Sequence, residues 1–294
     1  MEKLTHYEHK QRAKDVFLNN LVLTGDCKID LPAVNEEGQY WMCCWTHVLE
    51  EFFLRYGSAP SGYNGCFKEV KFPDPRSPLA KRASECLKKF NLQESGYIYK
   101  YGKAKYMRPA FEKGYFRISP ASSYNDPSLN PAIRDKELEI EITINPILTK
   151  IDVIDGKTGE PKGSIEPIGN RLNYQSTTDY YVFCLSSAFA PRLFLDFEND
   201  ACLVIKNVDL FLKRMNVHLS NQLAGWLHTA RPVNYIDPLN CNPNEIDIYL
   251  TKHFRYYYQK EFRALWIPRN PIKDLSPINI EMGSLHDICD LIQI

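Results

Sequence analysis

The sequence lacks three features that would define its class at once. No apolar run approaches the length of a membrane span, and the N-terminal stretch MEKLTHYEHKQRAKD is too polar for a signal peptide. Lysine plus arginine and aspartate plus glutamate number 36 each, so no net charge draws the chain toward nucleic acid or membrane. We therefore expect a cytoplasmic protein with no membrane partner, in which any nucleic-acid contact uses a local basic patch.

Motifs that bind metals or phosphates are also absent. The nine cysteines are scattered and form no CxxC pair, which argues against a zinc ribbon or a redox motif. Reduced thiols of a cytosolic protein are the simpler interpretation, and we expect no metal site. The four glycines between residues 155 and 175 lack the spacing of a phosphate-binding loop, and no Lys-Ser or Lys-Thr pair follows them.

The composition that remains is that of a globular protein. Hydrophobic residues make up 44% and charged residues 24% of the 294 residues, enough for one large domain or two modest ones. Apolar positions at helical spacing predict helices within residues 1–24, 38–57 and 79–90. We divide the chain into a mostly helical N-terminal region (1–92), a core (93–270) and an irregular C-terminal tail (271–294).

The helix over residues 38–57 offers one alternative function. Gln39, Cys44 and Trp45 resemble the nucleophile segment of papain-like proteases, in which a cysteine and a tryptophan begin a helix. The Cys-Gly-Ser-Cys-Trp run of those enzymes is absent, and no downstream histidine lies in a persuasive context. A buried aromatic helix is therefore the favoured interpretation.

The stretch from Tyr97 to Pro127 is the richest in functional side chains. Alternating residues predict strands over 97–101 and 115–119, with a short helix over 103–112 between them. Turn formers with polar side chains follow at 122–127. Two strands that end in such a loop are typical of a ligand site.

Further strands are predicted along the second half of the chain. Apolar or alternating runs predict strands over residues 138–144, 179–187, 201–208 and 261–268. The first of these alternates isoleucine with acidic residues, which indicates one face in contact with water. We assign the acidic residues to that solvated face and give them no functional role: Glu137, Glu139 and Glu141.

Five motifs, in this order, carry a family resemblance. They are Tyr-Ile-Tyr-Lys-Tyr (97–101), Gly-Tyr-Phe-Arg-Ile-Ser-Pro-Ala-Ser-Ser-Tyr-Asn-Asp-Pro (114–127), Phe-Cys-Leu-Ser-Ser (183–187), Ala-Cys-Leu-Val-Ile (201–205) and Gln-Lys-Glu-Phe-Arg (259–263). They resemble a bacterial family with a "YKY … FxSPxSxNDP … CFSE … YExEWR" pattern, often encoded near phage-defence genes. That family is similar to a divergent branch of the ADP-ribosyltransferases. The resemblance implies an α+β fold, with an ADP-ribosyltransferase-like split β-sheet core and a helical N-terminal region.

The resemblance also implies an NAD site built from three strands. A first-strand Arg or His holds NAD, hydroxyls on a middle strand support the nicotinamide, and a glutamate on a late strand performs the chemistry. Glu261, with Gln259, matches the catalytic element; Ser186 and Ser187 match the hydroxyls; and Lys100 occupies the first-strand position. The remaining candidate NAD-binding residues are Tyr99, Tyr101, Arg117, Ser119, Asn125 and Asp126.

Elementary chemistry agrees with these roles. Cleavage of the nicotinamide–ribose bond passes through an oxocarbenium-like transition state, which a nearby carboxylate stabilises. Lys260 and Arg263 flank Glu261 and should keep it ionised. We expect an NAD-dependent ADP-ribosyltransferase that modifies RNA, DNA or protein as a toxin or anti-phage defence effector, with an antitoxin protein as a partner. The alternatives are an NAD glycohydrolase and a non-catalytic nucleotide- or nucleic-acid-binding module with a degenerate site.

Two clusters, over residues 97–117 and 252–263, interleave basic side chains with aromatic ones. This composition suits single-stranded nucleic acid, because phosphates bind cations and bases stack on rings. A solvated face over an aromatic core is the competing interpretation. Both clusters flank the expected NAD site, so a nucleic-acid acceptor is one of the partners we consider.

Overall fold

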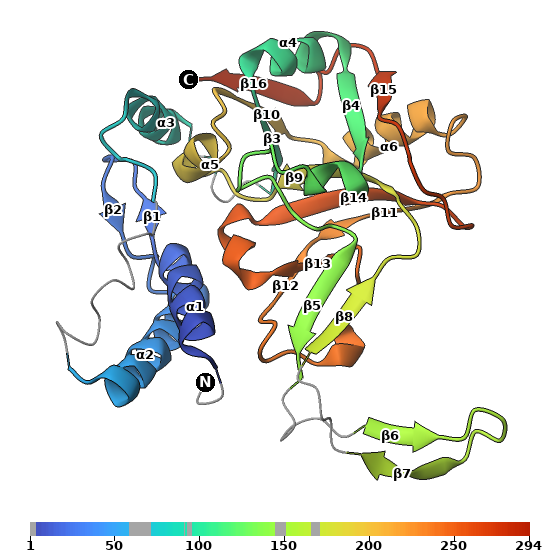
Figure 1. Ribbon diagram of the computed structural model, residues 1–294. Helices are drawn as coiled ribbons and strands as arrows, with labels where there is room; N and C mark the ends of the chain where they lie inside the picture. The colour runs from blue at the N-terminus through green and yellow to red at the C-terminus, as the bar shows by residue number, and fades with distance from the viewer. Residues whose placement is uncertain (1–3, 59–71, 91, 93–95, 145–150, 166–170) are drawn as a thin grey trace.

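The computed structural model describes residues 4–58, 72–90, 92, 96–144, 151–165 and 171–294. An eight-stranded antiparallel sheet lies at its centre, and helices cover both faces of this sheet (Figure 1). The predicted α+β class is therefore confirmed. No helix in the described ranges is long and apolar enough to cross a membrane.

The central sheet divides into two branches. Its strands are β3 (Ile98–Gly102), β4 (Tyr115–Pro120), β9 (Tyr181–Ser186), β10 (Ala201–Ile205), β11 (Leu227–Pro232), β14 (Glu261–Ile267), β15 (Ile278–Glu281) and β16 (Cys289–Gln293). One path runs β11-β14-β9-β3-β10-β16, and the other leaves β9 through β4 to β15. On one side of β9, Ser186 pairs with β3 and Val182 pairs with β4. The division therefore lies along the middle of β9.

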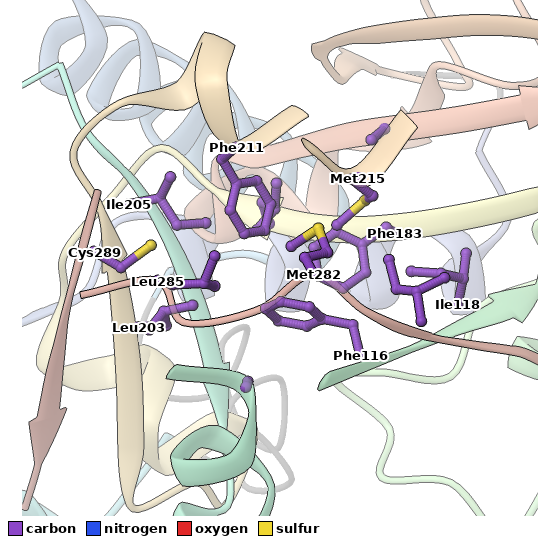
Figure 2. Close-up of a cluster of buried hydrophobic side chains, with 14 of the residues drawn as sticks. Phe116, Ile118, Phe183, Leu203, Ile205, Phe211, Met215, Met282, Leu285 and Cys289 are labelled. Carbon is purple, nitrogen blue, oxygen red and sulfur yellow. The ribbon is translucent and has the colours of Figure 1, made fainter. Parts of the chain in front are cut away.

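One face of the sheet is covered by α4 (Ala104–Lys113) and α6 (Val208–Leu219). Figure 2 shows Phe211 and Met215 of α6 gathered with Phe183 of β9 and Phe116 of β4, all buried. The strands β9 and β10 are apolar along their length because they are buried on both faces. The predicted helix and strands of this region are confirmed.

The opposite face packs against α3 (Pro78–Lys89) and α5 (Pro191–Asp196). Tyr99 and Tyr101 point toward this face, whereas Ile98 packs with the α4 and α6 side, as the two-residue period of a strand requires. The tyrosine rings contact Phe189 and Phe194 at centroid distances of 5.4 and 4.9 Å. The tyrosine ladder is therefore part of the core.

The N-terminal region consists of α1 (His6–Asn19), α2 (Glu36–Tyr56) and a small sheet of β1 (Val22–Leu23) and β2 (Ile29–Asp30). Thr5 and Glu8 form a capping box that begins α1. Buried residues of both helices, Trp41 and Phe52 among them, pack on Phe254 of the 3₁₀ segment η3 (Phe254–Gln259). The helical N-terminal region thus supports the segment that leads into β14 (Figure 1).

Shorter strands and 3₁₀ turns complete the fold. They are β5 (Glu139–Thr143), β6 (Ile151–Ile154), β7 (Pro161–Ile165), β8 (Arg171–Gln175), β12 (Asn234–Ile236), β13 (Thr251–His253), η1 (Ala121–Asn125) and η2 (Pro243–Glu245). The expectation of an irregular tail after residue 271 is wrong. Residues 289–293 form β16, which pairs along its whole length with β10 and buries Cys289 and Ile292. An exposed edge of β10 is thereby covered.

Candidate functional site

Three predicted site residues lie side by side across the sheet. Glu261 at the start of β14 pairs with Ser186 at the end of β9, and Ser186 pairs with Tyr99 of β3. These strand ends border a cavity of about 150 Å³, which the loop after β4 closes through Tyr124 and Glu137. We call this space the first cavity.

Glu261 is held between two buried cations at the wall of the first cavity. Its Oε1 accepts a hydrogen bond from Arg263 Nε, and its Oε2 accepts one from Lys252 Nζ, both at 2.7 Å. The glutamate is 5% exposed and Lys252 is 7% exposed. Burial alone would raise the pKa of Glu261, but the charges of Arg263 and Lys252 outweigh burial and hold that pKa well below its ordinary value. The carboxylate is therefore ionised and fully bonded.

Glu137 extends the same network of charges. Its Oε2 lies 2.7 Å from Arg263 Nη2, and its side chain is buried. The assignment of Glu137 to a solvated strand face is wrong, because β5 begins only at Glu139 and Glu137 lies in the loop above the sheet. Burial raises the pKa of Glu137 to about 7, although the charge of Arg263 opposes this shift. Four charged groups of alternating sign therefore share one buried site.

Lys100 lies at the division of the sheet. Its Nζ donates a 2.7 Å hydrogen bond to the carbonyl of Cys184, which lies between the two pairings of β9, and it is 4.5 Å from the Phe183 ring centroid. Within the described ranges, no carboxylate lies within 4.0 Å of this ammonium. Burial lowers the pKa of Lys100. The first cavity thus contains a cation without a close counter-ion.

Four other polar side chains at the first cavity are hydrogen-bonded to the protein backbone. The hydroxyls of Tyr99 and Tyr101 donate to backbone carbonyls at 2.8 and 3.0 Å. Ser186 Oγ donates to the carbonyl of Gln259 at 2.7 Å, and Gln259 Nε2 donates to a loop carbonyl at 2.7 Å. These four residues line the cavity, and two of the bonds connect neighbouring elements: Tyr101 joins β3 to the residues after β9, and Ser186 joins β9 to η3.

Five predicted site residues lie outside the first cavity: Arg117, Ser119, Asn125, Asp126 and Ser187. Arg117 and Ser119 belong to β4, which pairs with β9 at the opposite end of that strand from Ser186. The Asp126 carboxylate accepts a backbone hydrogen bond within its own turn, and Ser187 is exposed. Asn125 lines a second, neighbouring cavity. The structure therefore does not bring these five residues to the carboxylate of Glu261.

Sequence reasoning did not assign a site role to Lys252 or Glu137. In the sequence, Lys252 belongs to a basic and aromatic cluster that is typical of a nucleic-acid surface. In the structure, its side chain is buried against Glu261. The pair of Glu261 and Arg263 could have been expected to act together, because residues two apart in a strand share one face. No local signal identifies Glu137, whose burial depends on the path of a loop.

The remaining sequence hypotheses concern thiols and metals. Burial raises the pKa of the Cys44 thiol, the opposite of what a papain-like nucleophile requires. The eight cysteines in the described part of the chain are free thiols, and Cys66 lies outside that part. Among the described residues, no three or more His, Cys, Asp or Glu side chains are grouped so that they could hold a metal ion.

Comparisons with protein-family models, with curated proteins and with solved structures find no match for this chain. The geometry and the charges of the first cavity and its surroundings therefore indicate what the protein can do. The main elements of the site are the buried carboxylate of Glu261, the two cations bound to it, and the ammonium of Lys100, which has no carboxylate within 4.0 Å among the described residues.

Proposed function

We propose that the protein is an NAD-dependent ADP-ribosyltransferase that modifies a macromolecule, as an effector of toxin–antitoxin or anti-phage defence. The observation that carries the proposal is the alignment of Tyr99, Ser186 and Glu261 on three adjacent strands at one cavity. The sequence resemblance implies this order of first-strand, middle-strand and late-strand elements. The division of the sheet at β9 also supports an ADP-ribosyltransferase-like split core.

The charge state of the site supports the proposed reaction. The carboxylate of Glu261 remains ionised at neutral pH, so it can stabilise positive charge that develops on the ribose. The acceptor's lone pair forms the new bond to ribose C1′, and the C1′–N bond breaks. Neutral nicotinamide leaves with the bonding electrons, and the acceptor loses its proton to water. Glu261 acts on the transition state and forms no covalent bond.

The size of the first cavity limits how NAD binds. Its volume of about 150 Å³ is below the range of about 300–1,000 Å³ that is usual for small-molecule sites. We propose that it takes the nicotinamide–ribose end of NAD. The ammonium of Lys100, which has no close carboxylate among the described residues, then lies where it can attract a phosphate of the same molecule.

The test of this function uses NAD labelled in its adenylate phosphate, incubated with the purified protein and a cell lysate. Label that becomes attached to a macromolecule, and that nuclease or protease treatment then releases, supports transfer. Glu261→Gln should reduce the amount of attached label at least 100-fold. Both glutamine and alanine remove the negative charge that Lys252 and Arg263 share with Asp135 and Glu137, but glutamine keeps the side-chain length and one oxygen acceptor, so it disturbs the buried network less. Thermal melts confirm that the variant folds. Glu112→Gln, at an exposed carboxylate on α4, is the matched control and should retain activity. Full activity of Glu261→Gln would refute the assignment.

The alternatives give different outcomes in the same experiment. Free labelled ADP-ribose without a labelled macromolecule identifies an NAD glycohydrolase. One observation favours the non-catalytic binding module: both carboxylate oxygens of Glu261 are bonded to cations, so a substrate must displace Lys252 or Arg263 to reach them. Binding of NAD without any release of nicotinamide would establish the binding module.

A further inference from the structure

A second cavity, of about 500 Å³, adjoins the first. Glu137 and Lys252 line both cavities, so the two spaces are separated by part of the charged network around Glu261. The volume of the second cavity falls within the range of small-molecule sites and is sufficient for a nucleotide unit. This cavity is therefore the larger binding space next to the proposed chemistry.

The acidic residues of the second cavity already have cationic partners. Each carboxylate lies within 4.0 Å of a cation, in the pairs Asp135–Lys252 (3.4 Å), Glu137–Arg263 (2.7 Å), Glu139–Lys136 (3.3 Å) and Glu141–Arg171 (3.2 Å). Each of these carboxylates therefore has a cation beside it, although Lys252 and Arg263 each pair with Glu261 as well. A ligand in this cavity also meets the cations that have no close carboxylate partner.

Two arginines of this wall have, among the described residues, either no carboxylate beside the guanidinium or only one at the limit of an ion pair. Arg134 is exposed, and within the described ranges no carboxylate lies within 4.0 Å of its guanidinium. The closest carboxylate to Arg255 is that of Asp15, at the 4.0 Å limit, and Arg255 Nε is buried without a hydrogen-bond partner in the described part of the chain. Two guanidinium groups beside one cavity favour a phosphate.

The remaining wall suits the rest of a nucleotide. Ile140, Ile236 and Pro238 give it an apolar side, and Asn125 and Thr251 add polar groups. A base can lie against the apolar side while its phosphate binds the arginines. Four acidic residues line this cavity together with its cations, which argues against an acidic-peptide groove or a membrane surface.

We propose that the second cavity binds one nucleotide unit of a single-stranded nucleic acid, with Arg134 and Arg255 on its phosphate. The identification of this strand as the acceptor of ADP-ribose rests on the proposed function. The shared wall of Glu137 and Lys252 then brings the bound strand next to the ribose that Glu261 stabilises. A nucleic acid, not a protein, is the acceptor in this arrangement.

The test measures fluorescence anisotropy of a labelled twelve-nucleotide single-stranded RNA, and of DNA of the same sequence, with the full chain and no NAD. Arg134→Gln and Arg255→Gln should each weaken binding of at least one strand fivefold or more. Each should also lower the slope of log affinity against log salt by about 0.7, the value for one phosphate contact on a single strand. Arg231→Gln, at an exposed arginine of β11 outside both cavities, is the matched control. Thermal melts confirm that each variant folds.

Three outcomes would overturn the proposal: no binding of either strand, equal loss in all three variants, or binding of AMP as tight as that of the strand. The last outcome would indicate a site for a free nucleotide. Failure here is distinguishable from failure of the proposed function. If the protein releases nicotinamide from NAD but binds strands independently of Arg134 and Arg255, the enzymatic function stands and the nucleic-acid site in the second cavity is refuted.

Discussion

The ammonium of Lys252 lies 2.7 Å from Oε2 of Glu261, and both side chains are almost fully buried. An ion pair removed from water in this way costs desolvation energy, which its attraction only partly returns. Loss of one partner is the costly event, because the remaining charge stays buried without compensation. The pair therefore makes the integrity of the first cavity depend on both residues.

The first prediction concerns the loss of that partner. Lys252→Met should lower the free energy of unfolding by about 3–5 kcal/mol, because Glu261 and Asp135 both lose a cation. Lys206 forms an ion pair of similar length with Asp290, but at the surface. Lys206→Met should therefore lower the free energy of unfolding by less than about 1 kcal/mol. Urea unfolding of both variants measures the difference. Equal costs would show that the Lys252 pair is not buried in solution.

The second prediction concerns acid stability and His253. Burial and the charges of Arg255 and Arg12 lower the pKa of His253 from 6.5 to about 3. The unfolded chain therefore binds a proton that the folded protein excludes. This contribution to stability is complete above pH 6.5 and is lost as the pH falls toward 3. One pKa unit corresponds to about 1.4 kcal/mol, so the loss between pH 6.5 and 4.5 is up to about 3 kcal/mol.

His253→Asn is the informative variant for this prediction. His253 Nδ1 accepts a hydrogen bond from the backbone amide of Arg255 at the start of η3, and asparagine can keep this cap without a proton to gain. The stability of the variant should depend less steeply on pH between 6.5 and 4.5. Buried carboxylates with raised pKa values, such as Asp15, act in the opposite direction in both proteins, so the difference between the two profiles is the measurement. Parallel profiles would contradict the prediction.

Much of the central sheet was predictable because local pattern and tertiary burial agree there. β3, β9, β10 and β14 are continuous apolar or alternating runs, and both signals depend only on neighbouring residues. β16 escaped prediction, because it is a short edge strand whose partner, β10, lies about ninety residues earlier in the chain. Sequence patterns do not reveal a pairing over that separation.

The site was predictable in its strand residues and not in its loop residues. Family order brought Lys100, Ser186, Gln259 and Glu261 into one group, and all of them line the first cavity. Arg117 and the Asn-Asp turn did not join them, since their positions depend on which end of β9 receives β4. The NAD-binding and catalytic roles of these residues remain predictions.

Asn19 connects the N-terminal region to the site and gives that region a physical role. Its Nδ2 donates to the carbonyls of Phe254 and Arg255 at 3.2 and 3.3 Å, and its Oδ1 accepts from the amide of Tyr258 at 3.1 Å. One buried side chain of α1 thus holds η3, whose last residue, Gln259, lines the first cavity. The helix acts on the site through backbone hydrogen bonds.

The third prediction tests this connection. Asn19→Leu should cost about 1–3 kcal/mol of stability, because it leaves buried backbone groups of η3 without their partner. Hydrogen exchange at the Tyr258 amide should accelerate at least tenfold beyond the change in global stability. Thr5→Ala is the matched control, because it removes the N-cap of the same helix at a cost of about 1 kcal/mol. In this variant, exchange at the Tyr258 amide should accelerate only as much as the loss of global stability requires. If both variants change exchange at Tyr258 only through global unfolding, Asn19 does not hold η3 locally, and the N-terminal helices support the site through packing alone.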